Sequence, residues 1–107
     1  MKMNDMLKQA QQMQSQMLRV QESLGDERVE GAAGGGMVKT VFDGRGDLLE
    51  VKIDPAAIDP NDAEMLEDLV TAAVNDGLRK SRALAESKMG AVTSALGALG
   101  SSLGLSV

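Results

Sequence analysis

A stripe of apolar residues at helical spacing fills the C-terminal part of the chain and constrains the fold more than any other feature. The stripe is weaker at residues 79–84. Its members are Leu66, Leu69, Val70, Ala73, Val74, Leu78, Ala85, Met89 and Val92. This spacing predicts a helix from about residue 62 into the nineties, longer than the ~8–20 residues usual in globular proteins. At about 1.5 Å per residue, such a helix exceeds the width of a small sheet, so we expect part of it to project.

The N-terminal segment has a narrower helical pattern. Its apolar residues alternate at spacings of three and four, like the a and d positions of a heptad: Met3, Met6, Ala10, Met13, Met17, Val20 and Leu24. Leu7 and Leu18 widen the stripe slightly, and Gly25 is a natural stop. A seam this narrow predicts a helix that lies along one or two partners. A Met stripe at heptad spacing is more often core or dimer interface than a promiscuous binding groove.

Between the two helical segments the pattern alternates as it does in strands. The apolar and β-branched side chains of two predicted strands fall on one face of each: Val38, Thr40 and Phe42 in the first, and Leu49, Val51 and Ile53 in the second. A shorter strand begins at Val29, "GAAGGG" (31–36) reads as a flexible turn, and "DGRG" (43–46) has strong hairpin chemistry. These segments predict a three-stranded antiparallel meander.

Two Asp-Pro pairs separate the strands from the long helix. Asp54 can cap one helical turn over residues 55–58, and Asn61 with Glu64 matches a loose capping box. The order of elements predicts an α+β fold: a helix, a three-stranded antiparallel meander, a short helical turn and a long C-terminal helix. We expect one domain over residues 1–96 and a flexible Gly-rich tail over residues 97–107.

Composition limits the core and disfavours several kinds of chemistry. Phe42 is the single aromatic residue of the 107, so we expect oligomerisation to supply some of the burial that a small core lacks. The sequence has neither Cys nor His, and we therefore expect no enzyme, metal, cofactor or small-molecule substrate. No stretch approaches the ~20 apolar residues of a membrane span, and none reads as a signal peptide, so we expect a cytoplasmic protein.

Charge is segregated along the predicted C-terminal helix. Residues 54–78 carry seven carboxylates and no Lys or Arg. Arg79, Lys80 and Arg82 then follow within four residues, and Lys88 continues the basic bias. We therefore expect the acidic part to lie near the sheet and the basic part toward the projecting end.

Lys8 and Arg19 form a second basic feature, on the predicted N-terminal helix. They lie eleven residues apart, close to three full turns, and share a face with Gln12 and Ser15. Faces of cations and amides suit phosphate contacts, and Gln can also donate to base edges. The alternative is an ordinary solvated surface, which the small number of cations slightly favours.

Several joined motifs resemble one family. "GGGMVKTVFDGRGDLLEVKIDP" followed by "DAEMLEDLVTAAVNDGLRKS" resembles the YbaB/EbfC family of small bacterial nucleoid-associated proteins, and "MLKQAQQMQSQM" is similar to the first helix of that family. The resemblance covers roughly residues 5 to 90. It implies a helix–three-strand–helix protomer, a homodimer with helices projecting like tweezers, and binding of double-stranded DNA with little sequence preference.

The resemblance also implies where DNA would be contacted. The family places contacts on the first and last helices, and the cations found there in this chain are Lys8, Arg19, Arg79, Lys80, Arg82 and Lys88. One departure is Gly77, where similar sequences usually have Ala; it costs about 1 kcal/mol of helix propensity and can mark a bend.

The resemblance, together with the basic faces, implies a nucleoid-associated DNA-binding protein that affects nucleoid organisation or gene expression. We expect a homodimer that contacts the phosphates of double-stranded DNA. The lack of aromatic residues on the basic faces argues against single strands, which need stacking platforms. The alternative is a protein-interaction or scaffold module, in which the Met-rich seam docks a helical partner.

Overall fold

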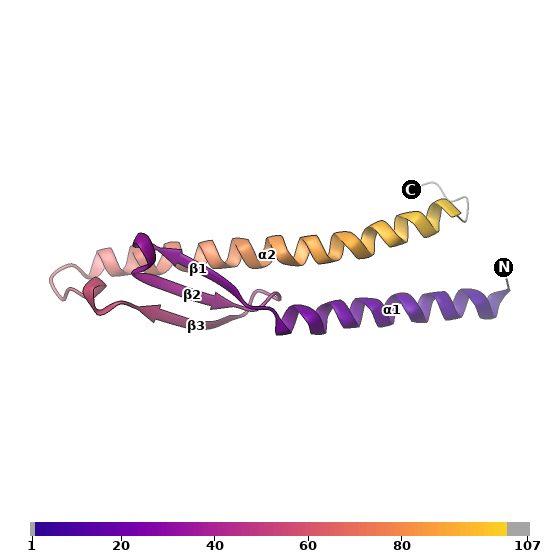
Figure 1. Cartoon of the computed structure of the whole chain (residues 1–107), viewed down its shortest axis with the longest axis horizontal. Coiled ribbons are helices and arrows are strands. Elements are labelled where there is room, and N and C mark those ends of the chain that lie inside the picture. Colours follow the sequence, from indigo (N-terminus) through magenta and orange to yellow (C-terminus); the bar gives the residue numbers. More distant parts are fainter. Residues whose placement is uncertain (1, 103–107) are drawn as a thin grey trace.

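The protein is described by a computed structural model that covers residues 2–102, with the side chains of residues 2–90. Two helices flank three strands: α1 (Met3–Asp26), β1 (Val29–Ala33), β2 (Val38–Phe42), β3 (Leu48–Ile53) and α2 (Ala63–Ser102). Single turns of 3-10 helix lie at Gly34–Gly36 and Pro55–Ala57. The strands form one antiparallel sheet in the order β1-β2-β3 (Figure 1), which confirms the predicted α+β meander.

The molecule is strongly elongated. It measures 71 × 23 × 16 Å and has a radius of gyration of 20.4 Å, against about 13 Å for a compact chain of this length. The first half of α2 lies on the sheet and the rest continues past it (Figure 1). Helix α1 leaves the sheet in the same direction, so both termini lie at one end of the molecule. The projection predicted from the length of the helix is therefore confirmed.

The core lies between the central strand β2 and α2. Val38, Thr40 and Phe42 are buried, on alternate positions of β2 as predicted. The β2–β3 register pairs Val38 with Ile53 and Thr40 with Val51. The helix-side face of β3 is nevertheless exposed, because α2 packs chiefly against β1 and β2.

Two glycines let α2 approach the sheet closely. A Cβ atom added to Gly31 would lie 2.4 Å from the Gly77 nitrogen, and one added to Gly77 would lie 2.6 Å from the Phe42 ring. At this short separation the Thr40 hydroxyl donates a 2.8 Å hydrogen bond to the carbonyl of Ala73 on α2. Gly77 therefore serves packing, and α2 continues through it without interruption.

Local details differ from the sequence-based expectations in the first turn and at the helix ends. β1 pairs through Gly31 to Ala33, so the turn is confined to Gly34–Gly36, whose positive φ angles of 62°, 66° and 94° favour glycine. Helix α1 ends at Asp26, just past Gly25. The turn is shorter than expected because pairing with β2 takes Gly31 to Ala33 into β1.

The cap of α2 also differs. The Asp62 carboxylate accepts from the Met65 N–H at 3.2 Å, so Asp62 takes the role expected of Asn61. The cap predicted at Asp54 is confirmed, since its carboxylate accepts from Ala56 N–H at 2.9 Å. Helix α2 includes residues 97–102 of the expected tail, whereas 103–107 lie outside the described residues. The flexibility of that tail stays a prediction.

The β2–β3 hairpin anchors the end of α1. The Gly44 N–H donates to the Leu24 carbonyl at 2.7 Å, and the Arg45 guanidinium donates to the Gln21 carbonyl at 2.9 Å. Leu24 is buried at this contact. In the part of the chain that the structure describes, no helix is long and apolar enough to cross a bilayer.

A cluster that we call the helix joint (Ser23, Glu27 and Lys88) ties α1 to α2. The Lys88 ammonium donates to the Ser23 hydroxyl at 2.6 Å and to the Glu27 carboxylate at 2.8 Å. The pair is half-buried, so it is less screened than a fully exposed ion pair. It joins residues about sixty positions apart and fixes where the two helices leave the sheet.

Gly77→Ala tests the close approach of α2 to the sheet. Although Ala favours helix by about 1 kcal/mol, we expect the free energy of unfolding to fall by about 1–3 kcal/mol, because the methyl group overlaps Phe42. Urea titration followed by circular dichroism measures the change. Gly90→Ala is the matched control, since a Cβ there meets nothing within 4 Å. Equal effects of the two substitutions would contradict the packing role.

A double-mutant cycle of Lys88→Met and Glu27→Gln tests the helix joint. We expect a coupling free energy of about 0.5–1 kcal/mol in urea unfolding, as for a well-oriented, partly exposed ion pair. Strictly additive effects of the two substitutions would show that the pair does not hold the helices together.

Candidate nucleic-acid interface

A buried serine orients the basic cluster of α2, which comprises Arg79, Lys80 and Arg82. Ser81 is fully buried, and its hydroxyl donates a 2.7 Å hydrogen bond to the Asp43 carbonyl at the β2–β3 hairpin. Successive helical residues are turned by about 100°, so an inward Ser81 turns its neighbours outward. Lys80 faces the β1 side, Arg82 faces the opposite side, and Arg79 lies between them on the solvent side.

The three cations of the basic cluster differ in their partners. The Arg79 guanidinium lies 3.4 Å from one oxygen of Asp76, and the Lys80 ammonium lies 3.0 Å from the other. Their side chains remain 73% and 54% exposed, so neither is folded inward. Arg82 is exposed and has no ion-pair partner among the described side chains. The basic cluster is therefore open to solvent, with one unpaired member.

Asp76 makes the separation of acid from base less complete than the sequence predicts. Its carboxylate accepts a 3.0 Å hydrogen bond from the Ala32 N–H of β1, in addition to its two cationic neighbours. The Ala32 N–H and then the Lys80 ammonium lower the pKa of Asp76, so the carboxylate is charged at neutral pH. The sequence held the signal, since Asp76 precedes Arg79 and Lys80 by three and four residues, the spacing of helical ion pairs.

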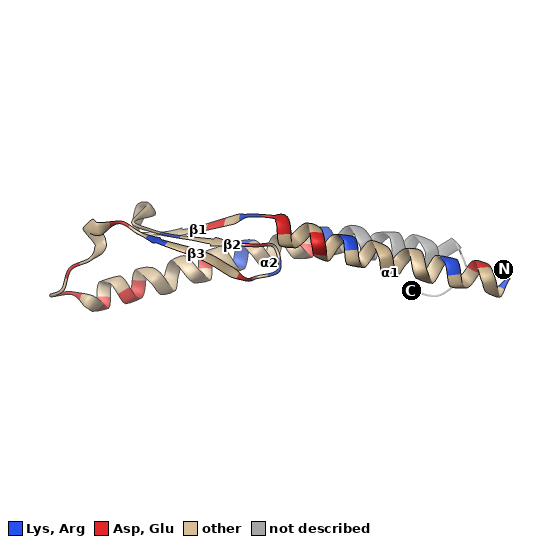
Figure 2. Cartoon of the chain, turned by 90° about the horizontal axis from the view of Figure 1, so that it is seen from below, with Lys and Arg blue, Asp and Glu red and all other residues tan. Residues whose placement is uncertain are grey.

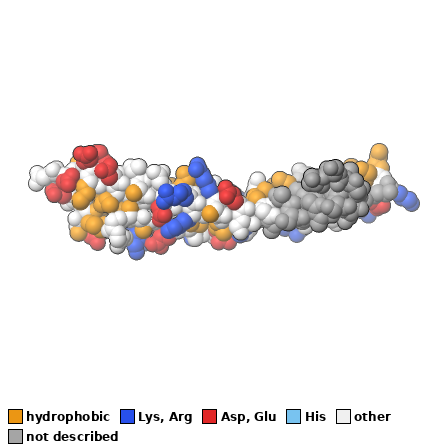
Figure 3. Space-filling view, turned by 90° about the horizontal axis from the view of Figure 1, so that it is seen from above, with side chains coloured by type: hydrophobic (Ala, Val, Ile, Leu, Met, Phe, Trp, Pro, Cys, Tyr) orange, Lys and Arg blue, Asp and Glu red, His pale blue; other side chains and the backbone are white. Residues whose placement is uncertain are grey.

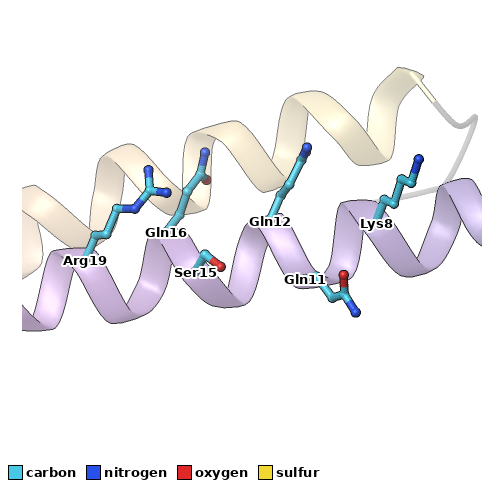
Figure 4. A pocket seen from close by; sticks show the side chains of 6 residues that line it. All are labelled: Lys8, Gln11, Gln12, Ser15, Gln16 and Arg19. Atoms are coloured by element: carbon cyan, nitrogen blue, oxygen red, sulfur yellow. The ribbon is translucent and has the colours of Figure 1, made fainter.

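Lys8 and Arg19 lie along one side of α1 with amides between them. Figure 4 shows their side chains projecting to the same side as those of Gln12 and Gln16. The groove that they border is lined by Lys8, Gln11, Gln12, Ser15, Gln16 and Arg19. Both cations are exposed, without an ion-pair partner among the side chains of residues 2–90. The row of cation and amide groups predicted for the N-terminal helix is thus present.

Lys88 differs from the other five predicted contacts. It lies in the helix joint, with its ammonium bound to Ser23 and Glu27. Lys88 follows Ser81 by seven residues, close to two turns, and therefore faces inward on α2. Its contact with DNA stays a prediction, and such a contact would require it to exchange these partners.

Charge is distributed along the long axis of the molecule. Figure 2 shows carboxylates on the part of α2 farthest from the termini, and Lys and Arg residues farther along α2 and on α1. On the face drawn in Figure 3, basic side chains gather near the middle of the molecule, with carboxylates beside them. Among the described residues, no group of three or more acidic side chains could hold a metal ion. The arrangement offers cations where the helices leave the sheet.

Comparisons with known proteins place these features in a family. The model of the YbaB/EbfC DNA-binding family matches residues 1–96. A nucleoid-associated protein of Moorella thermoacetica is 52% identical over 91 residues, which are 85% of this chain and 88% of that protein. One of Pelotomaculum thermopropionicum is 48% identical over 91 residues, 85% of this chain and 87% of its own length.

A solved structure has the same fold. The crystal structure of an uncharacterized protein from Helicobacter pylori superposes with a TM-score of 0.72 at 25% sequence identity, covering 90% of this chain and 98% of that one. The family model and the relatives span most of the sequence, including both helices and the sheet. The chain therefore belongs to the YbaB/EbfC DNA-binding family.

Proposed function

We propose that this protein binds double-stranded DNA as a homodimer, through backbone phosphates and with little sequence preference, and that it associates with the nucleoid. The observation that carries the proposal is the basic cluster, turned outward by the buried Ser81 on a chain of a DNA-binding family. Such binding would affect nucleoid organisation or gene expression. The nucleoid location rests on the names of the relatives.

Exposed cations on both helices support phosphate contacts. Arg82, Lys8 and Arg19 are free of ion pairs among the described side chains, and Arg79 and Lys80 are largely exposed. Phosphates attract such groups without reading bases, which agrees with weak sequence preference. The six predicted cations would give at most twelve in a dimer. If about half engage, log K should fall with log salt with a slope of about −5.

An uncovered strand supports the homodimer. Leu49, Val51 and Ile53 share the helix-side face of β3 and are 49%, 39% and 37% exposed. One edge of β3 pairs with β2, and its other edge has no strand beside it in the described sheet. Free strand edges and exposed apolar faces favour pairing with another chain.

The sequence of β3 complements itself. An antiparallel pair of β3 strands centred on Val51 would place Glu50 of each protomer opposite Lys52 of the other. The same register would place Leu49 opposite Ile53 on the helix-side face. Opposite charges and apolar side chains stabilise such cross-strand pairs, and this pairing has the two-fold symmetry usual in homodimers.

Charge reversal tests the DNA interface. With Arg79, Lys80 and Arg82 changed to Glu, we expect the loss of measurable duplex binding at about 100 mM salt and a shallower salt slope for any residual binding. Fluorescence anisotropy with a labelled duplex between about 50 and 300 mM salt measures both quantities.

A single reversal provides the control for folding. Arg82→Glu removes no described ion pair, and it should still weaken duplex binding. Lys39 lies on the face of the sheet opposite α2, where it pairs with Glu30 at 3.8 Å. Lys39→Glu makes the same charge change outside the basic cluster, at the loss of this exposed pair, and should weaken binding much less. Affinity that is indifferent to salt, or unaltered by the triple reversal, would refute DNA binding through this cluster.

Charge exchange on β3 tests the homodimer. Val51→Asp would place two carboxylates together at the two-fold axis, so we expect a monomer by sedimentation equilibrium. Glu50→Lys alone should weaken the dimer, and Glu50→Lys with Lys52→Glu should restore it. A dimer unaffected by Val51→Asp would locate the interface elsewhere.

The apolar stripe of α1 favours a second candidate function, a protein-interaction module. The large apolar side chains of α1 that are at least 42% exposed are Met3, Met6, Leu7, Met17 and Leu18. A helical protein partner could bury them. A complex that survives nuclease treatment and is lost on Met17→Glu would favour this function over DNA binding.

A further inference from the structure

We propose that Asp76 limits the affinity of the basic cluster for DNA by holding Arg79 and Lys80 in a partly neutralised state. This inference rests on the proposed function, because it concerns the same cations. It arises from the position of Asp76, one helical turn before the cluster and in contact with two of its three members.

The carboxylate of Asp76 is fixed in place. The Ala32 N–H of β1 donates to one of its oxygens at 3.0 Å, and the Lys80 ammonium donates to the same oxygen at 3.0 Å. Lys80 is held further by the Glu30 carbonyl at 3.4 Å. The side chain of Asp76 is only 24% exposed. Because its hydrogen bonds to β1 and α2 constrain it, the carboxylate cannot turn away when a phosphate approaches.

A phosphate that binds Lys80 or Arg79 must therefore compete with a stationary negative charge. Like charges at such short range weaken each other's attraction for a shared cation. Arg82 lies on the opposite side of α2, and no described carboxylate, Glu86 one turn later included, lies within ion-pair distance of it. In the native protein, Arg82 should therefore contribute more to duplex affinity than Lys80, although the two stand two residues apart.

The first test removes the charge of Asp76 and keeps its shape. Asp76→Asn retains an oxygen that can accept from the Ala32 N–H. We expect duplex affinity at about 150 mM salt to rise about three- to tenfold, and the salt slope of the full-length dimer to steepen by about 1–2, because released cations engage phosphates. Fluorescence anisotropy with a random-sequence duplex measures both.

Asp68→Asn is the matched control. It makes the same charge change on the same helix, eight residues and about 12 Å earlier. That distance exceeds the Debye length of about 8 Å at physiological salt, so the effect of Asp68 on the cluster is screened. Asp68→Asn should leave affinity within about twofold of the native value. If both variants raise affinity equally, net charge alone is responsible and the inference fails.

The second test does not depend on the folding of an Asp76 variant. In the native background, Arg82→Gln should weaken duplex binding several-fold more than Lys80→Gln. In the Asp76→Asn background, the two substitutions should weaken it about equally. An equal or larger effect of Lys80→Gln in the native background would overturn the inference.

The outcomes separate the inference from the proposed function. Absence of salt-dependent duplex binding by the native protein would refute the proposed function itself. Native binding that is salt-dependent, with no gain on Asp76→Asn, would refute only the inference. Circular dichroism and exchange protection of the Ala32 amide show whether Asp76→Asn keeps the contact between β1 and α2.

Discussion

The close approach of α2 to the sheet decides where every charged side chain of that helix points. Gly31 and Gly77 leave room for the helix backbone, and no larger residue fits at either position. Two buried hydroxyls then fix the rotation of the helix, through the bonds of Thr40 to Ala73 and of Ser81 to Asp43. Because Ser81 lies within the basic cluster, this rotation exposes the cations. The candidate interface thus depends on packing on the opposite face of the helix.

The sequence predicts the fold well because the hydrophobic period changes clearly between segments. The heptad stripe, the alternating strands and the long helical stripe each gave the correct element, and "DGRG" gave the hairpin. Predictions failed where local chemistry competes with pairing or packing. Gly31 reads as part of a flexible turn, yet it lies in β1 because its missing side chain admits α2. Asn61 and Asp62 are both good caps, and the geometry of the preceding turn selects Asp62.

The candidate site is harder to predict than the fold, because the acidic and basic segments that are separate along the chain meet in space. Asp76 belongs to the acidic segment by number, but it lies beside Arg79 and Lys80 in space. The spacing of three and four residues on a helix already predicts that Asp76 lies beside Arg79 and Lys80. The partners of Lys88 could not be found in this way, because Ser23 near the end of α1 and Glu27 just after it are separated from Lys88 by about sixty residues. Only the folded chain brings them together.

The position of Lys88 shows how a cation can support a nucleic-acid interface indirectly, by fixing the helices that carry the other cations. Its pairing with Glu27 holds α1 against α2 where both helices leave the sheet. The row of Lys8 and Arg19 on α1 therefore keeps a defined position relative to the basic cluster on α2. Because both sets of cations are already in place before a polyanion binds, the protein would lose little conformational entropy on binding. Of the six cations predicted to contact DNA, Lys88 is thus the one that also orders the helices.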